Sequence, residues 1–283
     1  MEPNALYLVA TPIGNLSDLS FRALEILKTC DLIAAEDTRV TAKLCAHYGI
    51  RTPVIAYHEH NKRAAGETIL TKLAAGETIA LVTDAGTPAV SDPGEDLVKA
   101  CIERGIGVIP IPGACAAISA LIVSGFDTAR FTFEGFLPQK KKDLEERLFR
   151  LSRETRTAIL YEAPHRLCDT LFLLANAVPD RRMALCRELT KLNEEVLRGT
   201  VRELYERMKN TPVRGEFVLV LEGAAPAQTD FSAMSVEEHF ESYLKQGYSK
   251  KDAVRLVAAD RKVPKNEIYM QFLHAKDEKE SES

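Results

Sequence analysis

The stretch VTDAGTPAVSDPG, residues 82–94, carries side chains that could bind a small molecule on a backbone with little bulk. Asp84 could accept hydrogen bonds from an amine or from hydroxyls, while Gly86 and Thr87 could offer backbone N–H groups to a carboxylate. An Asx turn, in which Asp84 binds its own backbone, accounts for the stretch equally well when it is taken alone. The neighbouring elements therefore decide whether these groups form a site.

Two other apolar runs end in loops of the same kind. The run at 5–10 leads into TPIGNLSD and the run at 106–111 leads into PGACAA, so all three loops are rich in proline, glycine or small residues. Since open α/β sheets bind ligands at the carboxyl ends of their strands, three such loops favour a shared pocket over three unrelated turns. They contain neither G-x-G-x-x-G nor G-x-x-x-x-G-K-[ST], which disfavours a dinucleotide or a nucleoside triphosphate.

The elements that would position these loops alternate between strands and helices. Strands are predicted at 5–10, 31–35, 78–84 and 106–111, and helices at 66–76, 92–105 and 113–125. Another helix, after the first strand, is expected to turn these residues inward: Phe21, Leu24, Ile26 and Leu27. Asp92 would cap the helix that stops at Gly105. The alternation is typical of a mostly parallel sheet covered on both faces.

The chain changes character near 126–134, where we expect the boundary between a domain at 1–125 and a second α/β domain at 126–225. In the second domain, strands are predicted at 157–162, 182–189 and 215–223, and helices at 165–178 and 201–209. A linker at 224–230 would lead to a small C-terminal helical module at 232–275. The charged tail at 276–283 is expected to be disordered.

Composition narrows the class of protein. The net charge of −4 implies no bulk attraction to nucleic acid, so RNA would have to bind through a local basic patch. The six cysteines include no C-x-x-C pair, which favours buried reduced thiols over a disulfide framework or a metal site. The N-terminus lacks the pattern of a signal peptide, and no apolar run approaches the roughly 20 residues of a membrane span. We therefore expect a cytoplasmic protein without membrane association.

Several motifs together resemble known families. LYLVATPIGNLSDLS, DLIAAEDTR, VTDAGTPAVSDPG and IPGACAAISAL are similar to the motifs of the tetrapyrrole-methylase-like superfamily. More narrowly, TPIGNLSD, AEDTR, HEHN, EGFLP, YEAPHRL and RELTK resemble the ribosomal RNA small subunit methyltransferase I family, in order over residues 5–223. The tetrapyrrole enzymes carry a G-x-G-P-G-D type of turn where this chain has ATPIGNLSD, a departure that favours the RNA branch.

The resemblance implies two α/β domains with a cofactor cleft between them, and S-adenosylmethionine as the cofactor. It also implies methylation of the ribose 2′-hydroxyl of a cytidine in 16S rRNA of the small ribosomal subunit. The cofactor residues it implies in the first domain are Pro12, Gly14, Asp84, Gly86, Thr87, Pro112, Gly113, Ala114 and Ala116. In the second domain they are Tyr161, Glu162, Leu185 and Gly215. Backbone amides and a carboxylate suit the polar end of this cofactor, and small side chains leave room for it.

Methylating a ribose hydroxyl, which is a weak acid, would gain from a base or a stabilising cation. The residues expected around the acceptor are Glu36, Asp37 and Arg39, with Glu188 and Lys191 opposite. His58 and His60 titrate in a suitable range, although a solvated loop explains them as well. For the acidic pair before Arg39, the alternative is a helix N-terminus, where the dipole favours acidic residues.

An RNA partner would need basic groups. The candidates on loops or near the domain boundary are Arg39, Lys62, Arg63, Lys140, Lys141, Lys142, His165 and Arg166. A run of three lysines is, however, usually plain solvated surface. The C-terminal module, helix-turn-helix-like at 246–269, could hold rRNA or only pack. The family also implies a homodimer. The alternatives are a tetrapyrrole C-methylase, a diphthine-synthase-like methyltransferase and, in another class, a non-catalytic RNA-binding ribosome assembly factor.

Overall fold

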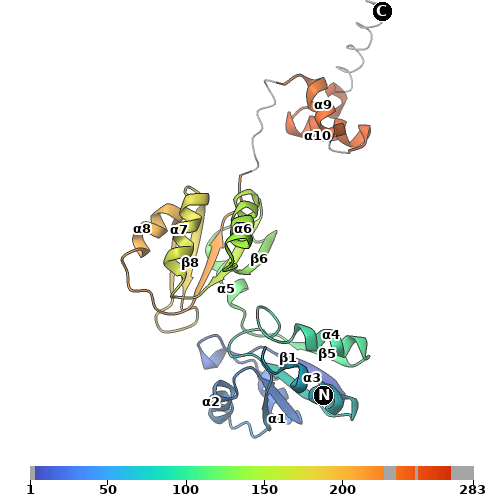
Figure 1. The fold of residues 1–283 in the computed structure, drawn as a ribbon, viewed down its shortest axis with the longest axis vertical. Helices are drawn as coiled ribbons and strands as arrows, with labels where there is room; N and C mark the ends of the chain where they lie inside the picture. The colour runs from blue at the N-terminus through green and yellow to red at the C-terminus, as the bar shows by residue number, and fades with distance from the viewer. Residues whose placement is uncertain (1–3, 226–233, 246–247, 269–283) are drawn as a thin grey trace, which may run out of the picture. The chain divides into compact units, whose positions relative to one another are not determined.

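The structure is a computed structural model that describes residues 4–225, 234–245 and 248–268 (Figure 1). Contacts between residues divide the chain into two compact units; the first ends at Ala224 and the second begins at Ala225. The first unit contains two five-stranded sheets, and the second is helical.

The first sheet is parallel throughout, as the alternation of strands and helices predicts. It has the order β3-β2-β4-β1-β5. The strands are β1 (Ala5–Val9), β2 (Leu32–Ala35), β3 (Val54–Ala56), β4 (Ile79–Val82) and β5 (Gly107–Ile111). Helices α1 (Phe21–Thr29) and α2 (Thr38–Tyr48) cover one face, and α3 (Lys62–Ala74) and α4 (Glu95–Glu103) the other. The parallel arrangement brings the three glycine- and proline-containing loops to one edge of the sheet.

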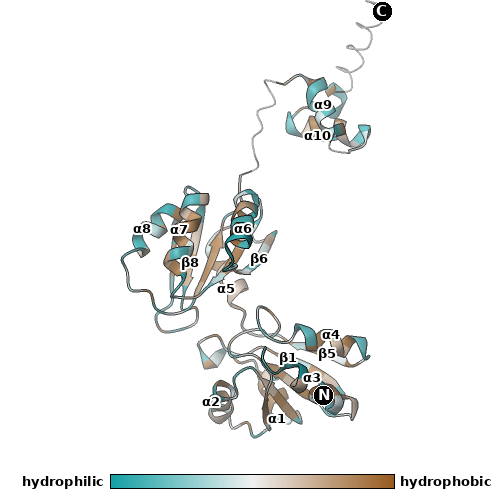
Figure 2. Ribbon diagram, in the orientation of Figure 1, coloured by the Kyte–Doolittle hydropathy of each residue, from teal (hydrophilic) through white to brown (hydrophobic). Residues whose placement is uncertain are grey.

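The second sheet is mixed, with the order β6-β7-β10-β8-β9. Its strands are β6 (Phe131–Phe136), β7 (Thr157–Glu162), β8 (Arg182–Arg187), β9 (Glu195–Thr200) and β10 (Phe217–Leu221). Only β6 and β7 pair in parallel; the other neighbours are antiparallel. Helices α6 (Lys141–Arg153), α7 (Leu167–Ala177) and α8 (Val201–Met208) bury one face of this sheet. Figure 2 shows strands of this sheet in brown and α6 largely in teal, as expected for an amphipathic cover.

Helix α5 (Ala116–Ser124) follows the last strand of the first sheet but packs on the second sheet. Its buried residues Ala117, Ala120 and Leu121 contact strand residues such as Ile159 and Val220. Small side chains let the helix approach the strands closely, so α5 ties the two sheets together. The boundary expected near 126–134 stays a prediction.

Three local predictions differ from the structure. Helix α4 begins at Glu95 with Gly94 as its N-cap, not with Asp92, because Gly94 takes a φ of 141° that turns the chain into the helix. Phe21 is 95% exposed and lies off the buried face of α1, which Ala23, Ile26 and Leu27 form. Strands β3, β6 and β9 were not predicted, since most of their residues are only partly buried or exposed.

The second unit contains α9 (Val236–Lys245) and α10 (Lys250–Asp260). The small core between them contains Val254, Val257 and Ala258 of α10 and also Ile268. His239 of α9 is fully buried, and its Nε2 lies 3.2 Å from Asp260 Oδ2. The expected helices of the C-terminal module are therefore present, whereas its part at 269–275 and the tail at 276–283 lie outside the described residues. Within 4–225, 234–245 and 248–268, no helix is both long and apolar enough to cross a membrane.

Candidate active site

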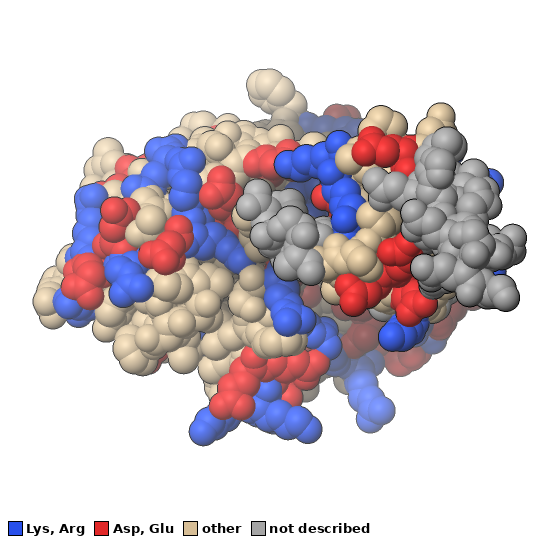
Figure 3. Space-filling view, turned by 90° about the horizontal axis from the view of Figure 1, so that it is seen from above, with Lys and Arg blue, Asp and Glu red and all other residues tan. Residues whose placement is uncertain are grey.

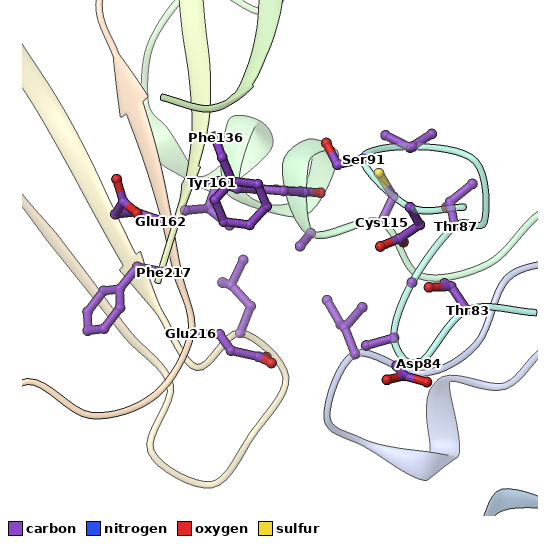
Figure 4. A pocket seen from close by; sticks show the side chains of 18 of the residues that line it. Thr83, Asp84, Thr87, Ser91, Cys115, Phe136, Tyr161, Glu162, Glu216 and Phe217 are labelled. Carbon is purple, nitrogen blue, oxygen red and sulfur yellow. The ribbon is translucent and has the colours of Figure 1, made fainter. Parts of the chain in front are cut away.

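A cavity of about 440 Å³ opens in the first unit between the loops of the parallel sheet and the facing ends of β7, β8 and β10. We call it the first cavity. It is lined by Ile13, Glu36, Thr83, Asp84, Ala85, Gly86, Thr87, Val90, Ser91, Asp92, Cys115, Ala116, Phe136, Tyr161, Glu162, Ala163, Pro164, Cys186, Leu189, Glu216, Phe217 and Val218. Figure 4 shows Thr83, Asp84 and Thr87 on one side, and Tyr161, Glu216 and Phe217 on the other. Both sheets therefore contribute to one site.

The lining of the first cavity is acidic. It includes the five carboxylates Glu36, Asp84, Asp92, Glu162 and Glu216, and the described lining residues include no lysine or arginine. Glu162 is turned away from the space (Figure 4), because its buried carboxylate accepts a hydrogen bond from Thr170 and lies 3.5 Å from Arg166 Nε. The other four carboxylates give the cavity a negative field suited to a cationic ligand.

Thr83 organises the acidic side of this cavity. It is 3% exposed, its hydroxyl donates to Glu36 Oε2 at 2.8 Å, and its carbonyl accepts the Thr11 hydroxyl at 3.1 Å. Burial raises the pKa of Asp92 to about 6, with the negative charges of Glu36 and Asp84 adding to the effect and a hydrogen bond with Thr83 opposing it. Asp92 therefore titrates closer to neutrality than an ordinary carboxyl group.

The aromatic wall comes from the second sheet. Tyr161 makes edge contacts with Phe133 and Phe136, with ring centroids 5.1 and 5.8 Å apart. The Tyr161 hydroxyl accepts a hydrogen bond from the backbone N–H of Ala117 at 3.2 Å, so it fixes the start of α5. Burial raises the pKa of Tyr161 to about 12, and the phenol stays neutral.

A second cavity, of about 320 Å³, adjoins the first. Five residues line both: Ile13, Thr83, Asp84, Ala85 and Glu216. The remaining walls come from the loop after β1, from α2 and from the loop after β8: Thr11, Pro12, Gly14, Leu16, Val40, Thr41, Lys43, Leu44 and Lys191. Unlike the first cavity, this one has lysines in its wall.

Lys191, in the loop after β8 of the second sheet, reaches the loop after β1. Its Nζ lies 2.8 Å from Glu188 Oε1 and 3.0 Å from Glu216 Oε2, and Glu188 also accepts the backbone N–H of Glu216 at 2.9 Å. Desolvation acts to lower the pKa of Lys191, but the two carboxylates together outweigh it and raise that pKa above its ordinary value. The stem of Lys191 lies against Gly14, where a Cβ would come within 2.3 Å of Lys191 Cγ.

Asp37 and Arg39 form a pair at the start of α2. Asp37 is the N-cap of α2 and accepts from the backbone and the guanidinium of Arg39, which lowers the pKa of Asp37 to about 2. The backbone N–H of Asp37 donates to Asp84 Oδ1 at 3.0 Å. The helix N-terminus that was an alternative for these residues is thus present, and it also orients Asp84.

The chain is similar to curated proteins over most of its length. The chain is 48% identical over 272 residues to "Ribosomal RNA small subunit methyltransferase I" of Halalkalibacterium halodurans, covering 95% of this chain and 94% of that protein. The same-named proteins of Bacillus subtilis and Escherichia coli O157:H7 are 48% and 45% identical, with 93% of this chain covered in each case and 92% and 93% of those proteins. The chain belongs to the ribosomal RNA small subunit methyltransferase I family. This membership confirms the predicted family and enzyme class, a methyltransferase.

The wider comparisons confirm the fold. Residues 5–205 match the family model of tetrapyrrole (corrin/porphyrin) methylases. A cobalt precorrin-4 methyltransferase superposes with a TM-score of 0.59 at 17% identity, covering 77% of this chain and 95% of that one. A diphthine synthase superposes with a TM-score of 0.58 at 14% identity, covering 77% and 90%. At these identities the structures establish the fold alone, which is the predicted arrangement of two α/β parts.

The structure brings most of the predicted residues to the two cavities. Those lining the first are Glu36, Asp84, Gly86, Thr87, Ala116, Tyr161 and Glu162, and those lining the second are Pro12, Gly14, Asp84 and Lys191. The predicted residues that line neither are Asp37, Arg39, Pro112, Gly113, Ala114, Glu188, Leu185 and Gly215. His58, His60 and the lysines at 140–142 also lie outside both linings.

Several of these other residues support the walls. The Ala114 carbonyl accepts the Thr87 hydroxyl at 3.1 Å, and Gly113 lies so close to Ala10 that a Cβ would be 2.9 Å from the Cβ of that residue. Gly215 has a φ of 96° and leaves room for Glu188. Leu185 is 1% exposed in the core beneath α7 and α8, while its neighbour Cys186 faces the first cavity.

Three charged lining residues were not predicted individually as site residues: Asp92, Glu216 and Lys43. Asp92 lies within the loop that first suggested a site, but its position before Pro93 and Gly94 indicated a helix cap instead. Glu216 lies in the segment RGE at 214–216, which the family resemblance implies as a whole although it names Gly215 alone as a cofactor residue. The signal available for Asp92 was the concentration of polar residues in its own loop, residues 82–94.

The hydrogen bond from Thr170 to Glu162 can be tested by measuring the stability of the folded protein. Thr170→Val keeps the shape of the side chain but removes the hydroxyl that donates to the buried carboxylate at 2.5 Å. We expect the free energy of unfolding to fall by about 1–3 kcal/mol, measured by urea denaturation. Thr68→Val, at an exposed position of α3 whose hydroxyl bonds only its own helix, is the control and should change it little. Equal effects of the two variants would contradict this role.

The contact between Gly14 and Lys191 is testable by activity. Gly14→Ala places a methyl group where the Lys191 stem lies, so we expect methylation to fall about 10-fold or more through displacement of that side chain. Gly76→Ala introduces a side chain at a φ of 97° with open space around it and serves as the control for backbone strain. If both variants lose activity equally, the Lys191 contact is not the cause.

Proposed function

We propose that this enzyme transfers a methyl group from S-adenosylmethionine to the ribose 2′-hydroxyl of a cytidine in 16S rRNA of the small ribosomal subunit. The observation that carries the proposal is the pair of adjoining cavities, one acidic and one containing lysine, within a chain of this family. The first cavity takes the methyl donor and the second takes the acceptor nucleotide.

The donor set of the first cavity fits S-adenosylmethionine, which carries a sulfonium and an ammonium against one carboxylate. The carboxylates of Glu36, Asp92 and Glu216 suit the two cationic groups. Cys115 and Ala116, at the N-terminus of α5, present backbone and helix dipole to an anionic group. Tyr161 and Phe136 offer an apolar surface to the adenine.

S-adenosylmethionine supplies an activated methyl group, so positioning of the acceptor is most of the catalytic task. On the acceptor side, Lys191 provides a positive charge near the oxygen that loses its proton, and Glu188 holds Lys191 in place. Asp37 and Arg39 orient the Asp84 loop through the Asp37 amide, and Glu36 fixes Thr83 at the boundary of the two cavities.

The RNA is held by local basic groups rather than by a uniform field. On the face drawn in Figure 3, lysines and arginines alternate with acidic residues. Lys140, Lys141 and Lys142 are exposed where α6 begins, and they are the candidates for phosphate contacts. Arg166, by contrast, is partly buried and donates to the Leu137 carbonyl at 2.8 Å, which supports a structural role. The second unit adds exposed lysines at 250 and 251.

The enzyme is further proposed to act as a homodimer in the cytoplasm. Support for the dimer comes from apolar side chains that α5 and β6 leave exposed in the single chain. Ile118 and Ile122 on α5 are 43% and 68% exposed, and Phe131 on β6 is 39% exposed. Sedimentation equilibrium of the purified chain tests this state.

One experiment decides among the acceptors. The purified enzyme is incubated with labelled S-adenosylmethionine and, separately, with 30S subunits, free 16S rRNA, a precorrin and an elongation factor. We expect label in the ribosomal RNA, mapped by mass spectrometry to one cytidine ribose. Label in the precorrin or the protein instead, or binding to 30S subunits without any label, would overturn the proposal in favour of the corresponding alternative.

A further inference from the structure

The boundary between the two cavities contains two carboxylates. Asp84 and Glu216 are the titratable residues that line both spaces. Glu216 is engaged with Lys191 at 3.0 Å, whereas Asp84 takes part in none of the ion pairs among the described residues. In Figure 4, Asp84 extends from the β4 loop and Glu216 reaches toward it from the β10 side. Asp84 is therefore the carboxylate at this boundary that is available to a ligand.

The orientation of Asp84 is fixed from one side. Oδ1 accepts the backbone N–H of Asp37 at 3.0 Å, and Asp37 is itself held as the cap of α2 and by its pair with Arg39. A carboxylate has two oxygens and can accept several hydrogen bonds, so Oδ2 keeps its capacity to accept. This tether holds the free oxygen at the boundary between the spaces for donor and acceptor.

We propose that Asp84 is the catalytic base, which accepts the proton of the ribose 2′-hydroxyl as that oxygen attacks the methyl group. The inference rests on the proposed function. As the bond between the 2′-oxygen and the methyl carbon forms, the bond from that carbon to sulfur breaks, and sulfur keeps its electron pair. The hydroxyl proton moves to Oδ2 of Asp84 and then to solvent.

The surroundings of Asp84 favour this role over that of a simple ion-pair partner. Asp84 is exposed at the boundary of the cavities, where desolvation by the surrounding walls raises the pKa of its carboxyl; the negative charges of Glu36 and Asp37 act in the same direction, while Arg39 opposes them. The Asp37 amide also stabilises the ionised form. From the second sheet, Lys191 and Glu216 face the same cavity wall, and Asp92 lies on the same loop.

The test compares chemistry with cofactor binding. Asp84→Asn should lower the single-turnover rate of methylation by about 100-fold or more, since a well-placed base contributes that much. Its Kd for S-adenosylmethionine, measured by calorimetry, should stay within about 3-fold of the wild-type value, because the proposal places Asp84 on the acceptor's proton. The acid limb of the pH–rate profile should disappear in Asp84→Asn and shift in Asp84→Glu. Asp96→Asn, on α4 outside both linings, is the matched control.

Three outcomes would overturn the inference: an Asp84→Asn enzyme that retains more than a tenth of the rate, a loss of cofactor affinity that matches the loss of rate, or an acid limb that is the same in Asp84→Glu as in the wild type. Thermal unfolding shows whether Asp84→Asn is folded, and if it is not, the shift in Asp84→Glu decides. Failure of the proposed function would look different, because the wild-type enzyme itself would then leave ribosomal RNA unmethylated.

Discussion

Replacing Lys191 with methionine is expected to reduce the methylation rate by about 100-fold, the effect typical of removing one group that stabilises developing negative charge. Lys191 is the cation that the loop after β8 presents to the second cavity, and it also neutralises Glu188 and Glu216 at 2.8 and 3.0 Å. In the variant, two carboxylates face the reacting oxygen without a counter-charge. The rate is measured with 30S subunits under single-turnover conditions.

Lys209→Met is the matched control, because Lys209 pairs with Glu206 at the end of α8, outside both cavity linings. It should keep the wild-type rate. Binding of S-adenosylmethionine to Lys191→Met should not weaken, since Lys191 lines only the acceptor cavity and its loss leaves Glu216, which lines both cavities, free to attract the cationic donor. A Lys191→Met enzyme with full activity would remove this residue from the mechanism.

The affinity for S-adenosylmethionine is expected to depend on pH through Asp92. Its pKa of about 6 means that Asp92 is ionised above that pH and attracts a cationic ligand, whereas below it the carboxyl is neutral. We therefore expect affinity to fall about 10-fold between pH 7.5 and pH 5, as one attractive charge is lost. S-adenosylhomocysteine, which lacks the sulfonium charge, should lose less.

Asp92→Asn separates this effect from that of the neighbouring carboxylates Glu36 and Asp84. The variant should bind S-adenosylmethionine more weakly at pH 7.5 and with little change down to pH 5, as measured by calorimetry. An unchanged pH dependence in Asp92→Asn would assign the effect to the other carboxylates.

The same variant should be more stable than the wild type at pH 8. Because the folded-state pKa of Asp92 is raised, the folded protein holds this proton more tightly than the unfolded chain, and stability falls as pH rises from about 4 to about 6. Asparagine removes that penalty, so Tm at pH 8 should rise by about 2–4 °C. A lower Tm would show that ionised Asp92 is stabilised by its surroundings.

Much of the site could be predicted because each of its parts is local. The apolar runs that became β1, β4 and β5 are followed at once by small, proline- and glycine-rich loops, and a parallel sheet places such loops at one edge. Asp84, Gly86 and Thr87 were found in this way and line the first cavity. The motifs in these loops also carried the family resemblance.

Which face a residue turns to could not be predicted in the second sheet. Leu185 and Cys186 are adjacent in β8, and the strand is apolar on both faces, so its sequence contains no alternation that would indicate the side facing the cavity. The helices α7 and α8 on one side, and α5 on the other, made that choice. Successive residues of a strand point to opposite faces, which is why Cys186 reaches the cavity and Leu185 does not.

The parallel sheet, the loops at its edge and the family are all predictable from local runs of residues. The contact of Lys191 with Gly14, and the position of Asp84 and Glu216 between the two cavities, depend instead on the packing of the two sheets. The physical reason is that these contacts join segments far apart in the chain. Their geometry depends on how α5 packs its small face against the second sheet, which no local pattern of residues encodes.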